Sequence, residues 1–190
     1  EVQTLINLLR VLADPTDERS NCGVGVVMDL DGGRGHDVVA DGLELLSCLE
    51  HRGTTGAEEN TGDGAGVMIQ TPHEFFREEL PVSLPDTYAV GSFFLPQHDE
   101  VGAALRDLVA DELADHGIET VHWRGVPTDN ADLGQTALDS EPDVWQCVVA
   151  PSDDLGAGQD GDGPTETADA FDTALYVARR SLGNRVEDEE

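Results

Sequence analysis

The sequence predicts an α+β domain in which helices cover a mixed or antiparallel sheet. Segments with strand character alternate along the chain with segments in which apolar residues recur every three or four positions. Several consecutive predicted strands are joined by stretches too short for a crossover helix, so antiparallel pairing must contribute. Leu, Ile, Val and Phe make up about a quarter of the 190 residues, above the roughly 20% typical of highly charged disordered chains. These observations exclude disorder over the whole length and a simple doubly wound parallel sheet.

Two buried strands and one helix are predicted near the N-terminus. Residues 22–30 (CGVGVVMDL) and 64–72 (GAGVMIQTP) are rich in small and β-branched residues, and each is expected to be a buried strand. The residues Asp, Gly and Gly at 31–33 end the first strand. Between the two strands, leucine and valine at three- and four-residue steps predict a helix over 38–50 that stops before the sequence HRG at 51–53. The candidates for chemistry lie at the start of the first strand, at Cys22, and just after this helix, in the HRG sequence.

Three strands and three helices are predicted in the rest of the chain. The strands are expected at 87–96, 118–127 and 143–151, and the helices at 73–80, at 99–117 and after Pro164. A Gly- and Asp-rich segment over 153–164 is predicted to be a mobile loop. The apolar residues expected on the buried faces of the last two helices are Val101, Leu105, Leu108, Leu113, Phe171, Leu175, Val177 and Ala178.

The charge balance excludes some classes of partner. The chain has 40 acidic residues and 10 basic ones, all of them arginine, so its net charge is −30. Such a field repels phosphate backbones and anionic lipids, so neither a nucleic acid nor a membrane is an expected partner. The acidic residues are spread along the chain, whereas an acidic interaction protein more often has a block of like charge. We interpret the composition as halophilic, because abundant salt would screen the self-repulsion.

Three cysteines, Cys22, Cys48 and Cys147, lack the paired spacing of a disulfide framework or a zinc site. No metal site is therefore expected, and the compartment is expected to be reducing. No apolar run approaches the 18 or so residues of a membrane span, and no secretory signal is visible. These observations favour the cytoplasm.

Cys22 is the most interesting candidate for chemistry, although a lone cysteine more often packs in a core. Small residues follow it and leave its sulfur accessible, whereas Cys48 and Cys147 have the neighbours expected of packed side chains. The glycine-rich loop at 61–66 (TGDGAG) precedes a strand instead of opening a helix, which does not fit a phosphate-binding loop. Its glycines are expected to form a tight turn with positive φ.

Several separated segments together carry a family resemblance. They are CGVGVVMDL, LEHRG, EENTGDGAGVMIQTPHEFF, WRGVPTDNADLG, SEPDVWQCVVA and LYVARR. In order and spacing they resemble the start of the type 2 glutamine amidotransferase domain of the glutamate synthase family, in the N-terminal-nucleophile hydrolase class. The resemblance covers nearly the whole chain, from about Asn21 to Arg180.

The resemblance implies a four-layer αββα fold, incomplete here at its C-terminal side, and a catalytic Cys22. Residues 1–21 would be a propeptide or an extraneous segment, and 22–190 the first part of the domain. Once Cys22 is N-terminal, its α-amino group, with a pKa near 7.7 to 8, can take the thiol proton. The thiolate would then attack the side-chain carboxamide of glutamine and release ammonia.

Arg52 matches the arginine of the family's HRG motif, which lies close to the nucleophile. The alternative is a structural ion pair with Glu50 or Glu58. A dyad of Cys22 with His51 is disfavoured, because the terminal amine already supplies a base. Asp63 and Gly64 are expected to shape the floor of the site.

The resemblance also implies parts that this sequence does not match. The Asn-Gly pair of the family's oxyanion hole and the residues that hold glutamine come from farther along the domain, so the 190-residue piece alone is expected to be inactive. FMN and an iron–sulfur cluster belong to the rest of the enzyme, where ammonia aminates 2-oxoglutarate to glutamate. The implied partners are L-glutamine and the remainder of the large subunit or a partner subunit. The alternative is a non-catalytic module that binds a partner.

Overall fold

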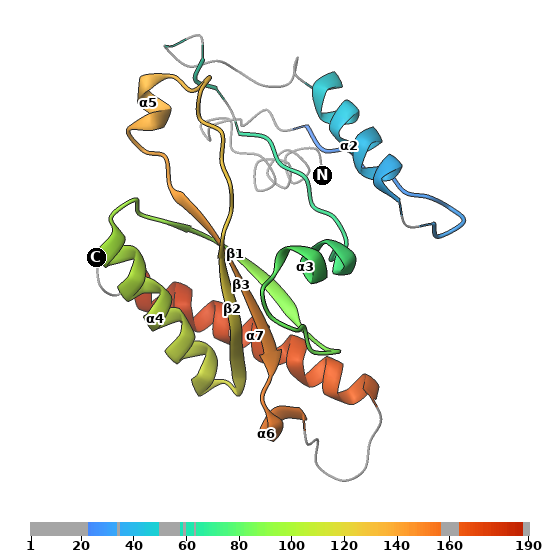
Figure 1. Ribbon diagram of the computed structural model, residues 1–190, viewed down its shortest axis with the longest axis vertical. Coiled ribbons are helices and arrows are strands. Elements are labelled where there is room, and N and C mark those ends of the chain that lie inside the picture. The colour runs from blue at the N-terminus through green and yellow to red at the C-terminus, as the bar shows by residue number, and fades with distance from the viewer. Residues whose placement is uncertain are drawn as a thin grey trace, which may run out of the picture. The chain divides into compact units, whose positions relative to one another are not determined.

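The structure, a computed structural model, describes residues 23–33, 35–49, 58, 60–62, 64–156 and 164–187. The chain divides into two compact units, residues 1–68 and 69–190, each of which is described by itself. The helices and strands, labelled in Figure 1, are α2 (His36–Cys48), α3 (His73–Glu79), β1 (Ala89–Leu95), α4 (Asp99–Asp115), β2 (Ile118–Gly125), α5 (Gln135–Leu138), β3 (Asp143–Pro151), α6 (Asp153–Gly156) and α7 (Pro164–Glu187).

The second unit is built on a three-stranded sheet with the order β1-β3-β2. β3 is antiparallel to both neighbours, so β1 and β2 run parallel to each other and α4 connects them as a crossover (Figure 1). Gly91 of β1 and Trp123 of β2 both pair with Cys147 of β3. The predicted α+β class and the antiparallel pairing are confirmed, and the observed bounds of β3 are those predicted.

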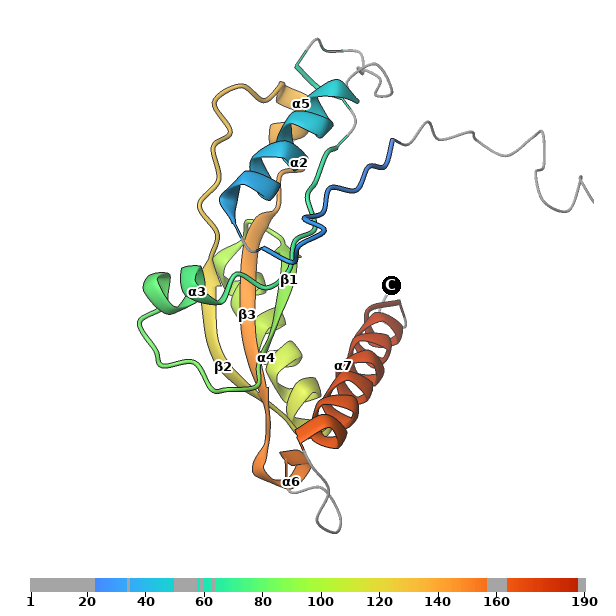
Figure 2. The ribbon, with the colours of Figure 1, turned by 90° about the vertical axis from the view of Figure 1, so that its right-hand side faces the viewer.

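Both faces of β3 are buried, because helices lie on both sides of the sheet (Figure 2). Cys147 and Val149 face a cluster that includes Phe171 of α7 and Val109 of α4. Val148 points to the opposite face. There it packs with Phe76 of α3 and with Leu80, the residue that follows this helix. A strand covered on both faces has a continuous apolar run, as CVVA in β3 does.

The buried stripe of α4 differs in part from the predicted one. Val109 and Leu113 are each 6% exposed, whereas Val101, predicted to face the core, is 44% exposed. Glu112 lies on the buried stripe, a position that an apolar pattern cannot identify. Gly117 adopts φ +72° just after the helix, the left-handed conformation in which a glycine commonly ends a helix.

α7 packs through a stripe with helical spacing. Phe171 and Ala178 are buried, and Leu175 is partly buried against the same cluster. Val177 is 43% exposed, so its predicted core position is wrong, because it lies one position to the side of this stripe. The predicted loop over 153–164 is replaced at its start by α6, and 157–163 lie outside the described residues.

The first unit contains α2 and two apolar segments, 23–30 and 64–68, that form no ladder in the part of the chain described. The strands predicted at 22–30 and 64–72 are therefore wrong for their described residues. Val24 is 88% exposed and Met68 is 98% exposed. Because a strand needs a neighbour for its N–H and C=O groups, apolar composition alone does not make one.

A turn follows residue 30, where residues 31–33 were expected to end a strand. The Asp31 N–H donates to Asp29 Oδ1 at 2.8 Å, and the Gly32 N–H donates to the Asp29 carbonyl at 3.2 Å. Gly32 adopts φ +73°, where a residue without a side chain is favoured. No helix among the described residues is long and apolar enough to cross a membrane.

Candidate active site

The side chains that the sequence singles out for chemistry mostly lie outside the described residues. Cys22, Arg52, His51 and Asp63 fall there, as does Glu50. Gly64 and Glu58 are described, and so are the segment after Cys22 and the helix before Arg52. The surroundings of the candidate site can therefore be built from these neighbouring segments of the first unit.

The segment after Cys22 meets α2 at Gly25. A Cβ atom placed on Gly25 would lie 2.2 Å from Leu45 Cδ2 and 2.9 Å from Leu45 Cγ. Heavy atoms in real structures do not approach so closely, so the Leu45 side chain occupies the space that any side chain at position 25 would need. This contact was not predicted, although Leu45 lies at helical spacing from Gly42 and Leu49.

α2 ends as predicted, before the HRG sequence. The last helical residue is Cys48, and the Leu49 N–H donates to the Leu46 carbonyl at 2.9 Å in a tight final turn. The half-buried residues of α2 are Val38, Val39, Gly42, Leu45, Leu46 and Leu49, which form one stripe. Cys48 is exposed, so the prediction that it packs in a core is wrong.

The loop with the sequence EENTGDGAG is held by Glu58 and Thr61. The Thr61 hydroxyl donates to Glu58 Oε2 at 2.9 Å, and the Thr61 N–H donates to the Glu58 carbonyl at 3.2 Å. Gly64 and Gly66 do not adopt the positive φ that was predicted for the glycines of this loop. Glu58 and Thr61 are instead joined by these two hydrogen bonds, and Gly64 and Gly66 belong to the segment that leads to α3.

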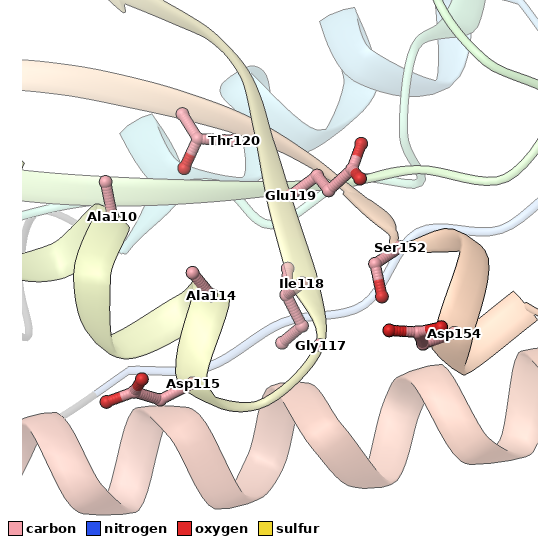
Figure 3. Close-up of a pocket in the computed structure, with 9 residues that line it drawn as sticks. All are labelled: Ala110, Ala114, Asp115, Gly117, Ile118, Glu119, Thr120, Ser152 and Asp154. Carbon is pink, nitrogen blue, oxygen red and sulfur yellow. The ribbon is translucent and has the colours of Figure 1, made fainter.

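A cavity of about 700 Å³ lies in the second unit, beside the end of α4 and the start of β2 (Figure 3). Three carboxylates, from Asp115, Glu119 and Asp154, line it, together with Ser152 and Thr120. No basic side chain lines the cavity. A ligand with a free carboxylate group would meet like charge there, and the lining offers no cation to pair with it.

Cys147 is a packed thiol, as predicted. It is 0% exposed in the core between the sheet and its helices. Burial raises the pKa of its thiol to about 11. Because only the thiolate is a good nucleophile, Cys147 is inert at neutral pH.

Glu112 is a second titratable group held inside the second unit. Its carboxylate accepts hydrogen bonds from Arg185 of α7 at 2.5 Å and from His116 at 3.2 Å. Hydrogen bonds from Ser181 and Arg185 lower the pKa of Glu112 to about 2. This cluster joins α4 to α7.

Among the residues that the structure describes, no group of three or more His, Cys, Asp and Glu side chains is placed to hold a metal ion. The described part of the chain thus offers no ligand set for an iron–sulfur cluster.

Comparison with known proteins gives one family over nearly the whole chain. The class-II glutamine amidotransferases match residues 22–190, a match that starts at Cys22.

The curated relatives are much longer proteins. The chain is 38% identical over 186 residues to the NADH glutamate synthase of Schizosaccharomyces pombe, with 93% of this chain and 8% of the relative covered. It is 32% identical over 186 residues to the chloroplastic ferredoxin-dependent glutamate synthase of Spinacia oleracea, with 95% and 10% covered. It is 33% identical over 173 residues to the NADPH glutamate synthase large chain of Bacillus subtilis, with 90% and 11% covered. The chain therefore spans about a tenth of the length of these relatives.

Proposed function

Because the chain belongs to the class-II glutamine amidotransferases, we propose that it is the glutaminase part of a glutamate synthase with Cys22 as the nucleophile. The observation that carries the proposal is the start of the family match at Cys22. The relatives named glutamate synthase in three organisms support the assignment to that enzyme. In this proposal residues 22–190 are the first part of the amidotransferase domain, and 1–21 are removed or extraneous.

The chemistry requires a free amine at Cys22. Hydrolysis of the bond between Asn21 and Cys22 gives an α-amino group that takes the thiol proton, which the same nitrogen in an amide cannot do. The thiolate attacks the side-chain carboxamide carbon of glutamine and forms a tetrahedral intermediate. The C–N bond breaks as the nitrogen receives a proton, and ammonia leaves. Water then hydrolyses the γ-glutamyl thioester to glutamate and restores the thiol.

Arg52 is proposed as a supporting residue. A guanidinium near the sulfur favours the thiolate over the thiol and orders the loop around it. The side chains that hold glutamine are assigned to no residue of this chain.

The remaining steps belong to other parts of the enzyme. Ammonia would pass to a domain that aminates 2-oxoglutarate, with FMN and an iron–sulfur cluster. Three of the relatives are named for NADH, ferredoxin and NADPH as different electron donors, at 38%, 32% and 33% identity. Sequence identity over this segment is therefore similar for relatives that use different electron donors.

An αββα arrangement is proposed for the complete domain. In support, α4 and α7 pack on one face of the sheet of the second unit (Figure 2), although α3 packs on part of the other face, around Val148. The remaining strands and helices would come from the polypeptide that follows residue 190.

We also propose a salt-adapted enzyme, on the basis of the net charge of −30 and the absence of lysine. A cytoplasmic location is proposed separately, because the three cysteines lack the spacing of a disulfide framework. Screening acts over about 3 Å at 1 M salt and about 10 Å at 0.1 M, so the self-repulsion grows as salt is removed. The melting temperature should therefore fall from 3 M to 0.1 M KCl when it is followed by circular dichroism. An unchanged melting temperature would exclude this adaptation.

The function is tested with Cys22→Ala in the complete protein. We expect glutamine-dependent glutamate formation to be lost, while the ammonia-dependent reaction continues, because only the first requires the thiolate. Cys147→Ser is the matched control at a thiol that we assign to packing. Retention of glutamine-dependent activity by Cys22→Ala would contradict the proposal and would favour a non-catalytic module.

A further inference from the structure

The helix α7 has a charge pattern that the proposed function does not use. Acidic residues occupy 40 of the 190 positions, yet residues 173–186 (TALYVARRSLGNRV) contain none, which is the longest run without an acidic residue in the sequence. Three of the ten arginines, Arg179, Arg180 and Arg185, lie in this run. The segment is therefore basic, whereas the chain as a whole is strongly acidic.

Burial does not explain why this run lacks acidic residues. The run 144–152 also lacks them, but it belongs to the covered strand β3 and none of its residues is exposed. In α7 only one stripe, with Phe171, Leu175 and Ala178, packs against the core. The rest of the helix surface in this run is exposed. Its outer face is defined here as Thr173, Tyr176, Val177, Arg179 and Arg180.

The two arginines of the outer face have no partner within the described part of the chain. Neither Arg179 nor Arg180 forms an ion pair or a hydrogen bond with a residue that the structure describes. No Asp or Glu lies three or four positions from either arginine, the spacing at which a helix brings two side chains together. Arg185, by contrast, donates to Glu112 inside the unit. The guanidinium groups of Arg179 and Arg180 can therefore receive carboxylates from elsewhere.

Tyr176 and Val177 add apolar surface beside these charges. Tyr176 is 62% exposed and Val177 is 43% exposed. Tyr176 lies three residues before Arg179 and four before Arg180, so the three side chains are neighbours on the helix surface. Protein interfaces are enriched in tyrosine and arginine and depleted in Asp and Glu relative to the remaining surface. The outer face of α7 has this composition.

We propose that the outer face of α7 binds an acidic segment from another part of the complete enzyme. The inference rests on the proposed function only in taking this chain as part of a larger glutamate synthase, and it does not involve Cys22. A guanidinium group pairs with a carboxylate through two parallel hydrogen bonds, and such a pair is screened less by salt once it is covered. A second copy of the chain fits less well, because two copies that meet through this same face would oppose their arginines.

The experiment places the photo-cross-linking amino acid p-benzoylphenylalanine at position 176 of the complete enzyme. After irradiation we expect the α7 peptide to be joined to an acidic peptide from outside residues 1–190, identified by mass spectrometry. Position 111, an exposed Asp on α4, is the matched control and should not give this product. A cross-link to a second copy, a cross-link to a peptide without Asp or Glu, the same product from position 111, or no product at all would overturn the inference.

Charge reversal tests the contribution of the arginines. Arg180→Glu is expected to lower the yield of the cross-link from position 176 about 5-fold or more, because the new carboxylate repels the acidic segment. Changing an acidic residue of the captured peptide to Arg should then restore the yield. Arg77→Glu makes the same change of net charge at an exposed arginine of α3 and should leave the yield unchanged.

Two further variants keep the outcome interpretable. If Arg180→Glu does not fold, Arg180→Gln removes the charge without repulsion and should still lower the yield. An unchanged yield in the folded Arg180 variant, or an equal loss in Arg77→Glu, would overturn the inference. Failure of the proposed function is distinguishable, because it would appear as glutamine-dependent activity in Cys22→Ala, a variant that should give the same cross-link as wild type.

Discussion

The two units of this chain have comparable apolar segments but bury them to different extents. In the second unit the central strand β3 has helices on both faces, and Cys147 and Val148 are each 0% exposed. In the first unit, Val24 and Met68 lie in equally apolar segments and are 88% and 98% exposed. The difference shows that a segment with strand-forming composition becomes a buried strand only when a neighbouring strand pairs with it and another layer covers it.

The largest contrast between the units should come from truncating a large side chain in each. Phe171→Ala removes a ring that is 3% exposed, and we expect it to lower the free energy of unfolding by about 3–5 kcal/mol. Met68→Ala, at a residue that is 98% exposed, should change it by less than about 0.5 kcal/mol. Guanidinium unfolding at constant high ionic strength measures both. An equal loss of unfolding free energy in the two variants would contradict the difference in burial between the two units.

A smaller contrast should come from two glycines with the same backbone conformation. Gly117 has φ +72° in the second unit, and Gly32 has φ +73° in the first. Alanine in the left-handed region costs about 1–2 kcal/mol, so Gly117→Ala should lower the stability of the second unit by that amount. Gly32→Ala should affect only hydrogen exchange around its own turn. A loss of global stability in both variants would show that the two units unfold together.

The smallest expected effect concerns how the stability of the second unit depends on pH. Hydrogen bonds from Ser181 and Arg185 lower the pKa of Glu112 from 4.5 to about 2. A carboxyl group with a lowered folded-state pKa stabilises the protein above its unfolded pKa, and this stabilisation is lost as the pH falls through the folded pKa. The stability of Glu112→Gln should therefore fall less steeply than that of wild type between about pH 4.5 and about pH 2. The exposed neighbour Asp111→Asn is the control, and it should keep the wild-type slope in thermal melts across this range.

The local sequence pattern was sufficient to predict an element where its contacts are close in sequence or where its apolar run is continuous. The bounds of β3 and the end of α2 before the HRG sequence were predicted correctly. The pattern did not predict burial where a residue far away in the sequence determines it. Glu112 is buried because Arg185, 73 residues later, bonds to it, and no helical periodicity contains that information.

The candidate site could be named from the sequence but not built from it. Cys22 and Arg52 follow from motifs in the printed sequence, and both stay predictions, since they lie outside the described residues. Leu45 could not be found, because its partner Gly25 is 20 residues earlier and has no side chain to form a pattern. The hydrogen bonds between Glu58 and Thr61 could not be found either, because the loop was interpreted from its glycines and not from its polar side chains.

The proposed chemistry requires Cys22 to be the first residue of the active protein. Its α-amino group is the proposed base, and an amide nitrogen cannot take that role. The measurement is the intact mass of the complete enzyme purified in active form, with its N-terminal residue identified by sequencing. We predict a chain that begins at Cys22, without residues 1–21. An active enzyme that still carries any residue before Cys22 would contradict the account.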